Sequence, residues 1–389
     1  MKAIDAVLEQ VVSRHRIAGV AAAAATRRGV AYEGAFGTAD VANDVGVSID
    51  SIFRIASMTK AVTSVAALQL VERGVIGLED DAAKHVPELG EVRVLERLDA
   101  ASGEPVLRPP ARPITVRQLL THTSGFSYEM WSPEIVAYRE QTSLPSVMEA
   151  GDDFMRAPLL DDPGARWDYS ISTDWLGRLV ERASGSNLDE YFRQNVLGPL
   201  AMRDTLFELP PDKLARLATV QQRQADGSLA ELPFGPPSPN GFYEGGGGLV
   251  STAGDYLRFL RMLLGEGALD GVRILEERTV QSMGEGQIGD LPVRALRTTN
   301  ADLSRDVDFF PGTAKTWGLG FLVNTEPLEG RRAAGSLSWA GFFNTYYWID
   351  LETGVCGVIL MQLLPFFDSE ATALYDAYER AVYASVSEH

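Results

Sequence analysis

Cysteine is almost absent from this sequence, since Cys356 is the only one in 389 residues. An intramolecular disulfide framework, a CxxC redox motif and a cysteine-based zinc site are therefore excluded. Cys356 lies in the apolar run 354–362, where we expect a small buried hydrophobic residue. Histidine is also scarce, and its four copies, His15, His85, His122 and His389, form no HExxH motif or other close pair. We expect neither a metal nor a cofactor.

Basic charge is in short supply, because 35 Lys and Arg residues stand against 53 Asp and Glu and leave a net charge of −18. Nucleic acids and anionic membranes both attract basic surfaces, so neither partner is expected. No apolar run approaches the roughly 18 residues of a membrane-spanning helix. The short apolar run 17–26 follows an amphipathic segment, 1–16, which is not the order of a signal peptide. We expect a soluble, cytoplasmic protein.

Several catalytic motifs are missing as well. No serine stands in a GxSxG elbow, no GxxxxGK[ST] loop exists, and no GxGxxG follows an expected strand. The glycine run Gly245–Gly248 has no basic partner for a phosphate, so we interpret it as backbone that needs unusual dihedral angles or close packing. The sequence therefore gives no support to α/β-hydrolase or nucleotide-binding chemistry.

Hydrophobic periodicity predicts strands towards both ends of the chain and helices between them. The expected helices are 1–16, 57–74, 115–121, 174–184, 188–196, 255–264 and 370–386. The expected strands are 19–26, 29–35, 52–56, 317–323, 344–350 and 354–362. The stretches 100–113 and 224–248 are rich in Pro and Gly and are interpreted as loops. This order predicts one sheet that both ends of the chain form, with a helical insertion.

One motif with a chemical meaning remains, Ser57-Met58-Thr59-Lys60, in a chain that has only five lysines. Three residues of helix turn through about 300°, so the Ser and Lys side chains lie on one face. The helix N-terminus stabilises negative charge on the serine oxygen, and a lysine withdrawn from water there can accept the serine proton. The alternative is a capped surface helix with a solvated lysine. The apolar segments 52–56 and 61–70 favour the buried, catalytic interpretation.

Three segments, in this order and spacing, resemble a known superfamily: Phe53-Arg-Ile-Ala-Ser-Met-Thr-Lys60, Leu119-Leu-Thr-His-Thr-Ser-Gly-Phe126 and Tyr169-Ser-Ile-Ser172. They resemble the serine β-lactamases and penicillin-binding proteins, and among these most the family VIII carboxylesterases and related acyltransferases. The resemblance implies an α/β (α+β) fold, in which helices flank an antiparallel sheet and a mainly helical subdomain is added. It implies a single catalytic domain, 1–389, with an α/β subdomain at about 1–55 and 240–389 and a helical subdomain at about 56–239.

The resemblance also implies catalytic roles. Ser57 would be the nucleophile that forms an acyl-enzyme, and Lys60 would be its general base. Tyr169 would be the second proton-transfer residue, between the serine oxygen and the leaving group; the alternative is a partly buried tyrosine after a turn. The backbone N–H groups of Ser57 and Phe342 would form the oxyanion hole, and such donors are worth about 3 kcal/mol each.

Other positions concern the substrate pocket. Tyr128 matches a pocket tyrosine of related esterases, and a packing role is the alternative. Trp339 and Gly341, in the triplet Trp-Ala-Gly, would stand where penicillin-recognising relatives have Lys-Thr-Gly. His122 is expected to be structural, because the mechanism has no place for a histidine.

Two departures from the family pattern bear on the substrate. Ile171 stands where the lactamases and peptidases often have an asparagine that contacts the substrate amide. Trp339 supplies no cation for a substrate carboxylate. An apolar tryptophan wall instead suits a neutral acyl or alkyl group. We therefore predict a serine carboxylesterase (EC 3.1.1.-) that hydrolyses short-chain neutral esters.

Three alternatives stay open. A β-lactamase or D-amino-acid peptidase could use the same scaffold, and so could an acyltransferase that delivers the acyl group to an alcohol. A non-catalytic binding or sensor domain is the third, and the intact Ser57, Lys60 and Tyr169 argue against it. The only partner that the sequence implies is a small-molecule ester. The sequence does not identify the natural ester or the oligomeric state. We expect the loops 100–113 and 224–239 to form the rim that sets specificity.

Overall fold

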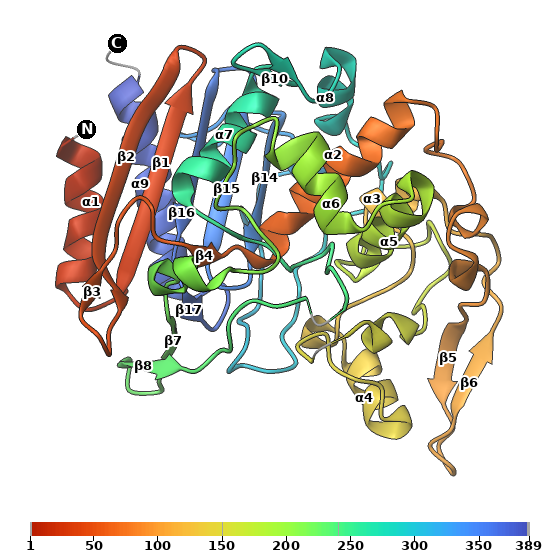
Figure 1. Cartoon of the computed structure of the whole chain (residues 1–389). Helices are drawn as coiled ribbons and strands as arrows, with labels where there is room; N and C mark the ends of the chain where they lie inside the picture. Colours follow the sequence, from red (N-terminus) through yellow and green to blue (C-terminus); the bar gives the residue numbers. More distant parts are fainter. Residues whose placement is uncertain (1, 150, 240, 387–389) are drawn as a thin grey trace.

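Figure 1 shows the computed structural model of the chain, which describes residues 2–149, 151–239 and 241–386. Its main feature is an eight-stranded sheet with the order β12-β13-β14-β15-β16-β1-β2-β3. All neighbouring strands in it are antiparallel. The strands are β1 (Gly19–Thr26), β2 (Gly29–Asp40), β3 (Val45–Gly46), β12 (Lys315–Trp317), β13 (Leu322–Asn324), β14 (Ser336–Gly341), β15 (Thr345–Asp350) and β16 (Val355–Leu360). The predicted sheet from both ends of the chain is confirmed.

The strand β1 lies inside this sheet, between β16 and β2, although most of its residues are alanines. Alanine favours helices, but here Ala21 to Ala25 are fully buried and pair with both neighbouring strands. Small side chains leave room for helices to pack closely on the strand. Tertiary packing therefore overrides the local helical preference.

Helices cover both faces of the sheet (Figure 1). On one face, α1 (Lys2–Ser13) and α9 (Ser369–Val386) pack against each other and against the central strands. On the other face, α7 (Ala253–Leu264) packs on β1, β15 and β16. Thr252, the residue before this helix, is its N-cap, because its hydroxyl accepts a hydrogen bond from the Asp255 N–H (3.1 Å). Its apolar stripe covers the sheet.

The helical part of the molecule is built around α2 (Thr59–Glu72), whose residues from Thr59 to Leu70 are all buried. A helix that is apolar all round is typical of a core position. Against it pack α5 (Ser172–Ser184) and α6 (Leu188–Phe192), and α3 (Val116–Leu120) contacts α5. The helices α4 (Pro133–Thr142) and α8 (Glu277–Met283) lie further out. Within the described ranges, no helix is long and apolar enough to cross a membrane.

Short strands complete the fold. They are β4 (Phe53–Arg54) with β9 (Val250–Ser251), β5 (Val94–Leu98) with β6 (Pro105–Arg108), β10 (Ala268–Leu269) with β11 (Val272–Arg273), and β17 (Leu363–Leu364) with β7 (Val220–Arg223) and β8 (Leu229–Leu232). Two of these strands, β6 and β8, lie in the stretches 100–113 and 224–248 that the sequence predicts as loops. The loop predictions were therefore incomplete.

The prediction of one strand over 317–323 is wrong, because β12 ends at Trp317 and β13 begins only at Leu322. Gly320 has a φ of 95°, in the left-handed region that favours glycine. A Cβ on Gly318 would lie 1.9 Å from the Met283 carbonyl oxygen. The two glycines build a turn in a segment whose apolar residues resemble a strand. The predicted helix 188–196 also differs, since α6 gives way to a π-helical turn over 193–197.

Candidate active site

Ser57 lies in a 3₁₀ turn, Ala56–Met58, between β4 and α2. The strand β4 pairs with β9, and the Ile55 N–H donates to the Leu249 carbonyl (3.1 Å), which fixes the chain before the turn. Ala56 has a φ of 43°. Left-handed backbone costs a non-glycine residue about 1–2 kcal/mol. The surrounding structure therefore holds Ala56, the residue before Ser57, in a strained conformation next to the start of α2.

Lys60 lies in the first turn of α2 and is only 3% exposed. Its Nζ donates to Ser57 Oγ (3.2 Å), to Tyr128 Oη (3.0 Å) and to the Gly246 carbonyl (2.6 Å). A base in hydrogen-bond contact with a serine hydroxyl is the arrangement that activates the nucleophile. The structure thus brings the predicted pair together, and the alternative of a solvated lysine on a surface helix is wrong.

Asp174, a fully buried carboxylate on α5, holds two of the three partners of Lys60. Its Oδ1 accepts from the Gly246 N–H (2.8 Å), and its Oδ2 accepts from Tyr128 Oη (3.4 Å). Burial raises the pKa of Asp174, and the charge of Lys60 opposes that rise. The carboxylate also balances the charge of Lys60 in the interior. The sequence analysis did not single out this residue, because nothing local marks it.

The structure places both predicted tyrosines beside Lys60, but only Tyr128 is hydrogen-bonded to it. Burial and the charge of Asp174 raise the pKa of Tyr128 far above its usual range, so the phenol keeps its proton. The Tyr169 ring lies 4.9 Å from Lys60 Nζ, and Tyr169 Oη accepts from Trp339 Nε1 (3.0 Å). No acceptor for the Tyr169 O–H is present among the described residues, so that proton is available to a ligand in the cavity.

The strand β14 approaches the nucleophile turn very closely. A Cβ on Gly341 would lie 2.1 Å from the Ile55 carbonyl oxygen, so only glycine lets the strand pass. Phe342, the next residue, lines the same cavity as Ser57. Trp339 is 4% exposed and packs against the Tyr169 ring, behind the cavity wall rather than in it. The oxyanion hole at the N–H groups of Ser57 and Phe342 stays a prediction.

His122 supports Tyr169 from behind, since the two ring centroids are 4.8 Å apart. Its Nδ1 accepts a hydrogen bond from the Ser170 N–H (3.3 Å). Burial and the charge of Lys60 lower the pKa of His122, so the ring is neutral at pH 7. These contacts favour the expected structural role. His389 lies outside the described residues, and in the described part of the chain no group of three or more His, Cys, Asp or Glu side chains is placed to hold a metal ion.

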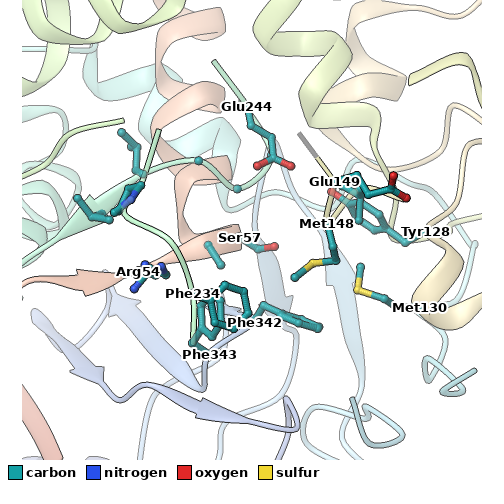
Figure 2. A pocket seen from close by; sticks show the side chains of 18 of the residues that line it. Arg54, Ser57, Tyr128, Met130, Met148, Glu149, Phe234, Glu244, Phe342 and Phe343 are labelled. Atoms are coloured by element: carbon teal, nitrogen blue, oxygen red, sulfur yellow. The ribbon is translucent and has the colours of Figure 1, made fainter. Parts of the chain in front are cut away.

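A cavity of about 400 Å³ opens above Ser57 (Figure 2). Its walls are mainly apolar and include Met130, Trp131, Val147, Met148, Phe234, Phe342 and Phe343. The segment 234–238 belongs to the predicted rim loop 224–239. The other predicted rim loop, 100–113, does not line this cavity, because its residues form part of the outlying hairpin β5–β6 (Figure 1).

Arg54 is a cation in this cavity that the sequence analysis missed. It precedes Ser57 on β4, donates to the Gly235 carbonyl (2.6 Å), and places its guanidinium over the Phe234 ring. Burial lowers the pKa of Arg54 to about 10, which leaves it charged at pH 7. No described carboxylate pairs with it. Trp339 supplies no cation, as expected, but Arg54 on β4 brings one to the wall of this cavity.

The comparisons with known proteins fit this geometry. The family model described as Beta-lactamase matches residues 4–380. Monacolin J acid methylbutanoyltransferase of Aspergillus terreus is 35% identical over 87% of this chain and 83% of its own. Lovastatin esterase of Penicillium rubens is 32% identical over 87% of this chain and 86% of its own. The solved structure of simvastatin synthase from Aspergillus terreus has a TM-score of 0.85 and 31% identity, and the match covers 98% of this chain and 97% of that one.

Proposed function

The chain belongs to the Beta-lactamase family, with the fold that its motifs predicted, and on this premise we propose that it is a serine acyltransferase with esterase activity. In this proposal Ser57 takes an acyl group from an ester and passes it to a hydroxyl group of a small molecule. One relative is named as a methylbutanoyltransferase and another as an esterase. In general an acyltransferase passes the acyl group to a molecule such as an alcohol, and an esterase passes it to water. Acyl transfer is one of the alternatives that the sequence left open beside the predicted carboxylesterase activity, and both reactions use the same acyl-enzyme.

The observation that carries this proposal is the contact between Lys60 Nζ and Ser57 Oγ at the base of an apolar cavity. A serine alone is a weak nucleophile, and the buried lysine supplies the base that it needs. The apolar walls suit the carbon chain of an acyl group. Asp174 and Tyr128 hold Lys60 in place from the other side.

The proposed reaction has two steps. The reacting form of Lys60 is the neutral amine: Ser57 Oγ attacks the ester carbonyl while its proton passes to the lone pair of Lys60 Nζ, and the N–H groups of Ser57 and Phe342 stabilise the oxyanion. The ester C–O bond then breaks, the leaving alkoxide takes a proton from Tyr169 Oη, and Lys60 returns a proton to Tyr169. In the second step an acceptor hydroxyl attacks the acyl-enzyme and the same proton transfers run in reverse. Water in place of the acceptor gives hydrolysis.

The presence of Arg54 favours substrates, either the acyl donor or the acyl acceptor, that carry an anionic group. Arg54 lines the same cavity as Ser57, and its guanidinium has no carboxylate partner among the described residues. The name of one relative, Monacolin J acid methylbutanoyltransferase, includes an acid, which fits the same chemistry. We therefore extend the predicted neutral esters to substrates whose apolar part rests on the walls and whose anionic group pairs with Arg54.

The test combines p-nitrophenyl butyrate as donor with 1-hexanol as acceptor. We expect a burst of p-nitrophenol, a butyryl adduct on Ser57 by intact mass and peptide mapping, and hexyl butyrate as product. Ser57→Ala should give none of these, while the exposed control Ser369→Ala should behave as wild type. Wild-type rates in Ser57→Ala would overturn the assignment. Nitrocefin and D-alanyl peptides in the same assay distinguish the lactamase and peptidase alternatives, and the ratio of hexyl butyrate to butyrate separates transferase from esterase.

A further inference from the structure

Glu244 has a carboxyl group inside the cavity that takes no part in the proposed acyl transfer at Ser57. It lines the cavity above Ser57, and in Figure 2 its carboxyl points into the open space towards that serine. No described residue donates a hydrogen bond to this carboxyl. Glu244 also borders a smaller neighbouring cavity of about 80 Å³, which Phe207 and Phe242 line. It therefore stands where the main cavity continues into a side cavity.

The loop that carries Glu244 is fixed against the catalytic helices. Lys60 Nζ donates to the Gly246 carbonyl (2.6 Å), and Thr63 Oγ1 donates to the Gly245 carbonyl (2.6 Å). The N–H of Gly246 in turn donates to Asp174 (2.8 Å). The backbone that follows Glu244 is thus held against α2 and α5, and a fixed backbone is one requirement of a specificity contact.

The glycines after Glu244 leave its carboxyl uncovered. A Cβ on Gly246 would lie 2.5 Å from Asp174 Oδ2, so this loop needs glycine for close packing against α5. A Cβ on Gly247 would lie 3.4 Å from Glu244 Oε2. The glycine run, which the sequence indicated as a place of close packing, therefore also opens the space around the Glu244 carboxyl.

The surroundings of Glu244 favour its neutral form. Burial raises the pKa of Glu244 to about 8, the charge of Asp174 on α5 adds to the rise, and Lys60 on α2 opposes it. Tyr128, whose pKa the charge of Glu244 also raises, keeps its proton, and Glu149 is a further carboxyl that lines both cavities. Asp174 accepts two hydrogen bonds that favour its charged form, whereas Glu244 accepts none from the described residues. These surroundings thus favour the carboxylic acid form of Glu244, which can both donate and accept a hydrogen bond.

We propose that Glu244 is a specificity-determining residue that binds a second hydroxyl group, or another uncharged polar group, on the alcohol part of the substrate. This inference rests on the proposed acyl transfer at Ser57. A polar group surrounded by apolar walls selects strongly for a ligand group that completes its hydrogen bonds. A hydroxyl group matches a carboxylic acid in both directions, as acceptor and as donor. The preferred acceptors are accordingly alcohols with a further hydroxyl, rather than simple alkanols.

The experiment compares 1-hexanol with the 1,2-, 1,3-, 1,4-, 1,5- and 1,6-hexanediols as acceptors from the butyryl-enzyme. Wild type should give monoester from at least one diol with roughly tenfold or higher kcat/KM than from 1-hexanol. Glu244→Leu should lose this preference and keep, or improve, transfer to 1-hexanol. Glu244→Gln retains a donor and an acceptor of similar shape, so it should keep most of the preference at pH 7. Glu285→Gln changes an exposed carboxyl that follows α8 and lines neither cavity, and it should behave as wild type.

The p-nitrophenol burst distinguishes the proposed acylation of Ser57 from the proposed role of Glu244 in the choice of acceptor. A normal burst in all variants shows that acylation of Ser57 works and that any change lies in acceptor choice. A preserved diol preference in Glu244→Leu, or no diol preference in wild type despite a normal burst, overturns the role of Glu244 alone. Loss of the preference in Glu244→Gln as complete as in Glu244→Leu would also contradict hydrogen bonding as its basis. Absence of the burst in wild type overturns the proposed function itself.

Discussion

At the scale of single residues, the environment of Lys60 depends on one carboxylate. Asp174 uses its two oxygens for two different partners of Lys60, the Gly246 backbone and the Tyr128 phenol. The same charge offsets that of Lys60 where water is excluded. Asp174 does not touch Ser57, so we regard it as a positioning residue whose removal should change the chemistry through Lys60.

We expect Asp174→Asn to lower kcat/KM for p-nitrophenyl butyrate by about 100-fold, because a hydrogen bond to a charged group is worth about 1.5–3 kcal/mol and about 1.4 kcal/mol is tenfold in rate. The pH profile of kcat should shift as well, since Lys60 loses its countercharge. Asp255→Asn, a partly buried carboxyl on α7 outside the cavity, is the matched control. Circular dichroism checks that both variants fold. A folded Asp174→Asn variant with the wild-type rate and pH profile would refute the positioning role.

At the scale of elements, the site exists because β14 passes directly beside the turn that carries Ser57. The missing side chain of Gly341 permits that approach, and Phe342 follows into the cavity. Glycines at helix ends have a different role, because they adopt the left-handed conformation that ends a helix. Gly185, with a φ of 76°, ends α5 in this way. Glycines of the two kinds should therefore differ in what their substitution costs.

We predict that Gly341→Ala lowers kcat by tenfold or more, because its Cβ would overlap the Ile55 carbonyl and a shift of about 1 Å at a catalytic site can cost 100-fold. Gly254→Ala, in the first turn of α7, meets no atom closer than 4.0 Å and should keep full activity. It should also raise the free energy of unfolding by about 0.5–1 kcal/mol. Steady-state kinetics measure kcat, and urea unfolding measures the free energy of unfolding. Equal activity of the two variants would mean that β14 has room to move.

The sequence allowed local features to be predicted and left distant ones unseen. Ser57 and Lys60 were found because they lie in one short motif, and the hairpin β1–β2 because its apolar runs flank a turn. Asp174 and Glu244 were missed because their partners come from other parts of the chain and no spacing connects them. Arg54 lies in the same motif as Ser57, but only the folded structure shows that it lines the cavity. The strand over 317–323 failed because glycine packing, not hydrophobicity, breaks it.

At the scale of the whole molecule, one buried ion pair joins α9 to the loop between β13 and β14. Arg332 and Glu379 are both 0% exposed, and two hydrogen bonds of 2.8 Å connect the guanidinium to the carboxylate. Tyr375 on α9 also accepts from Arg332. The pair lies outside the cavity, so it bears on stability rather than on chemistry.

We expect Glu379→Gln to lower the free energy of unfolding by about 3–5 kcal/mol, since it leaves the Arg332 charge buried without a partner. The double variant Arg332→Met with Glu379→Leu should recover most of this loss, because well-packed apolar residues can replace a buried pair. Thermal and urea unfolding give the comparison, and kcat at low temperature should stay near wild type in each variant. A double variant as unstable as Glu379→Gln would mean that the loss does not come from the unpaired charge.

The pairing of β1 with β16 has a consequence for how the protein is made. Ala21 lies opposite Leu360, so during translation at about 5–20 residues per second the first strand waits roughly 20–70 s for its neighbour. Throughout that time one edge of an alanine-rich apolar strand has free N–H and C=O groups, which other nascent chains on the same messenger can reach. Slower initiation, or a chaperone that covers the emerging hairpin, should therefore improve the yield of folded protein more than any change at the active site.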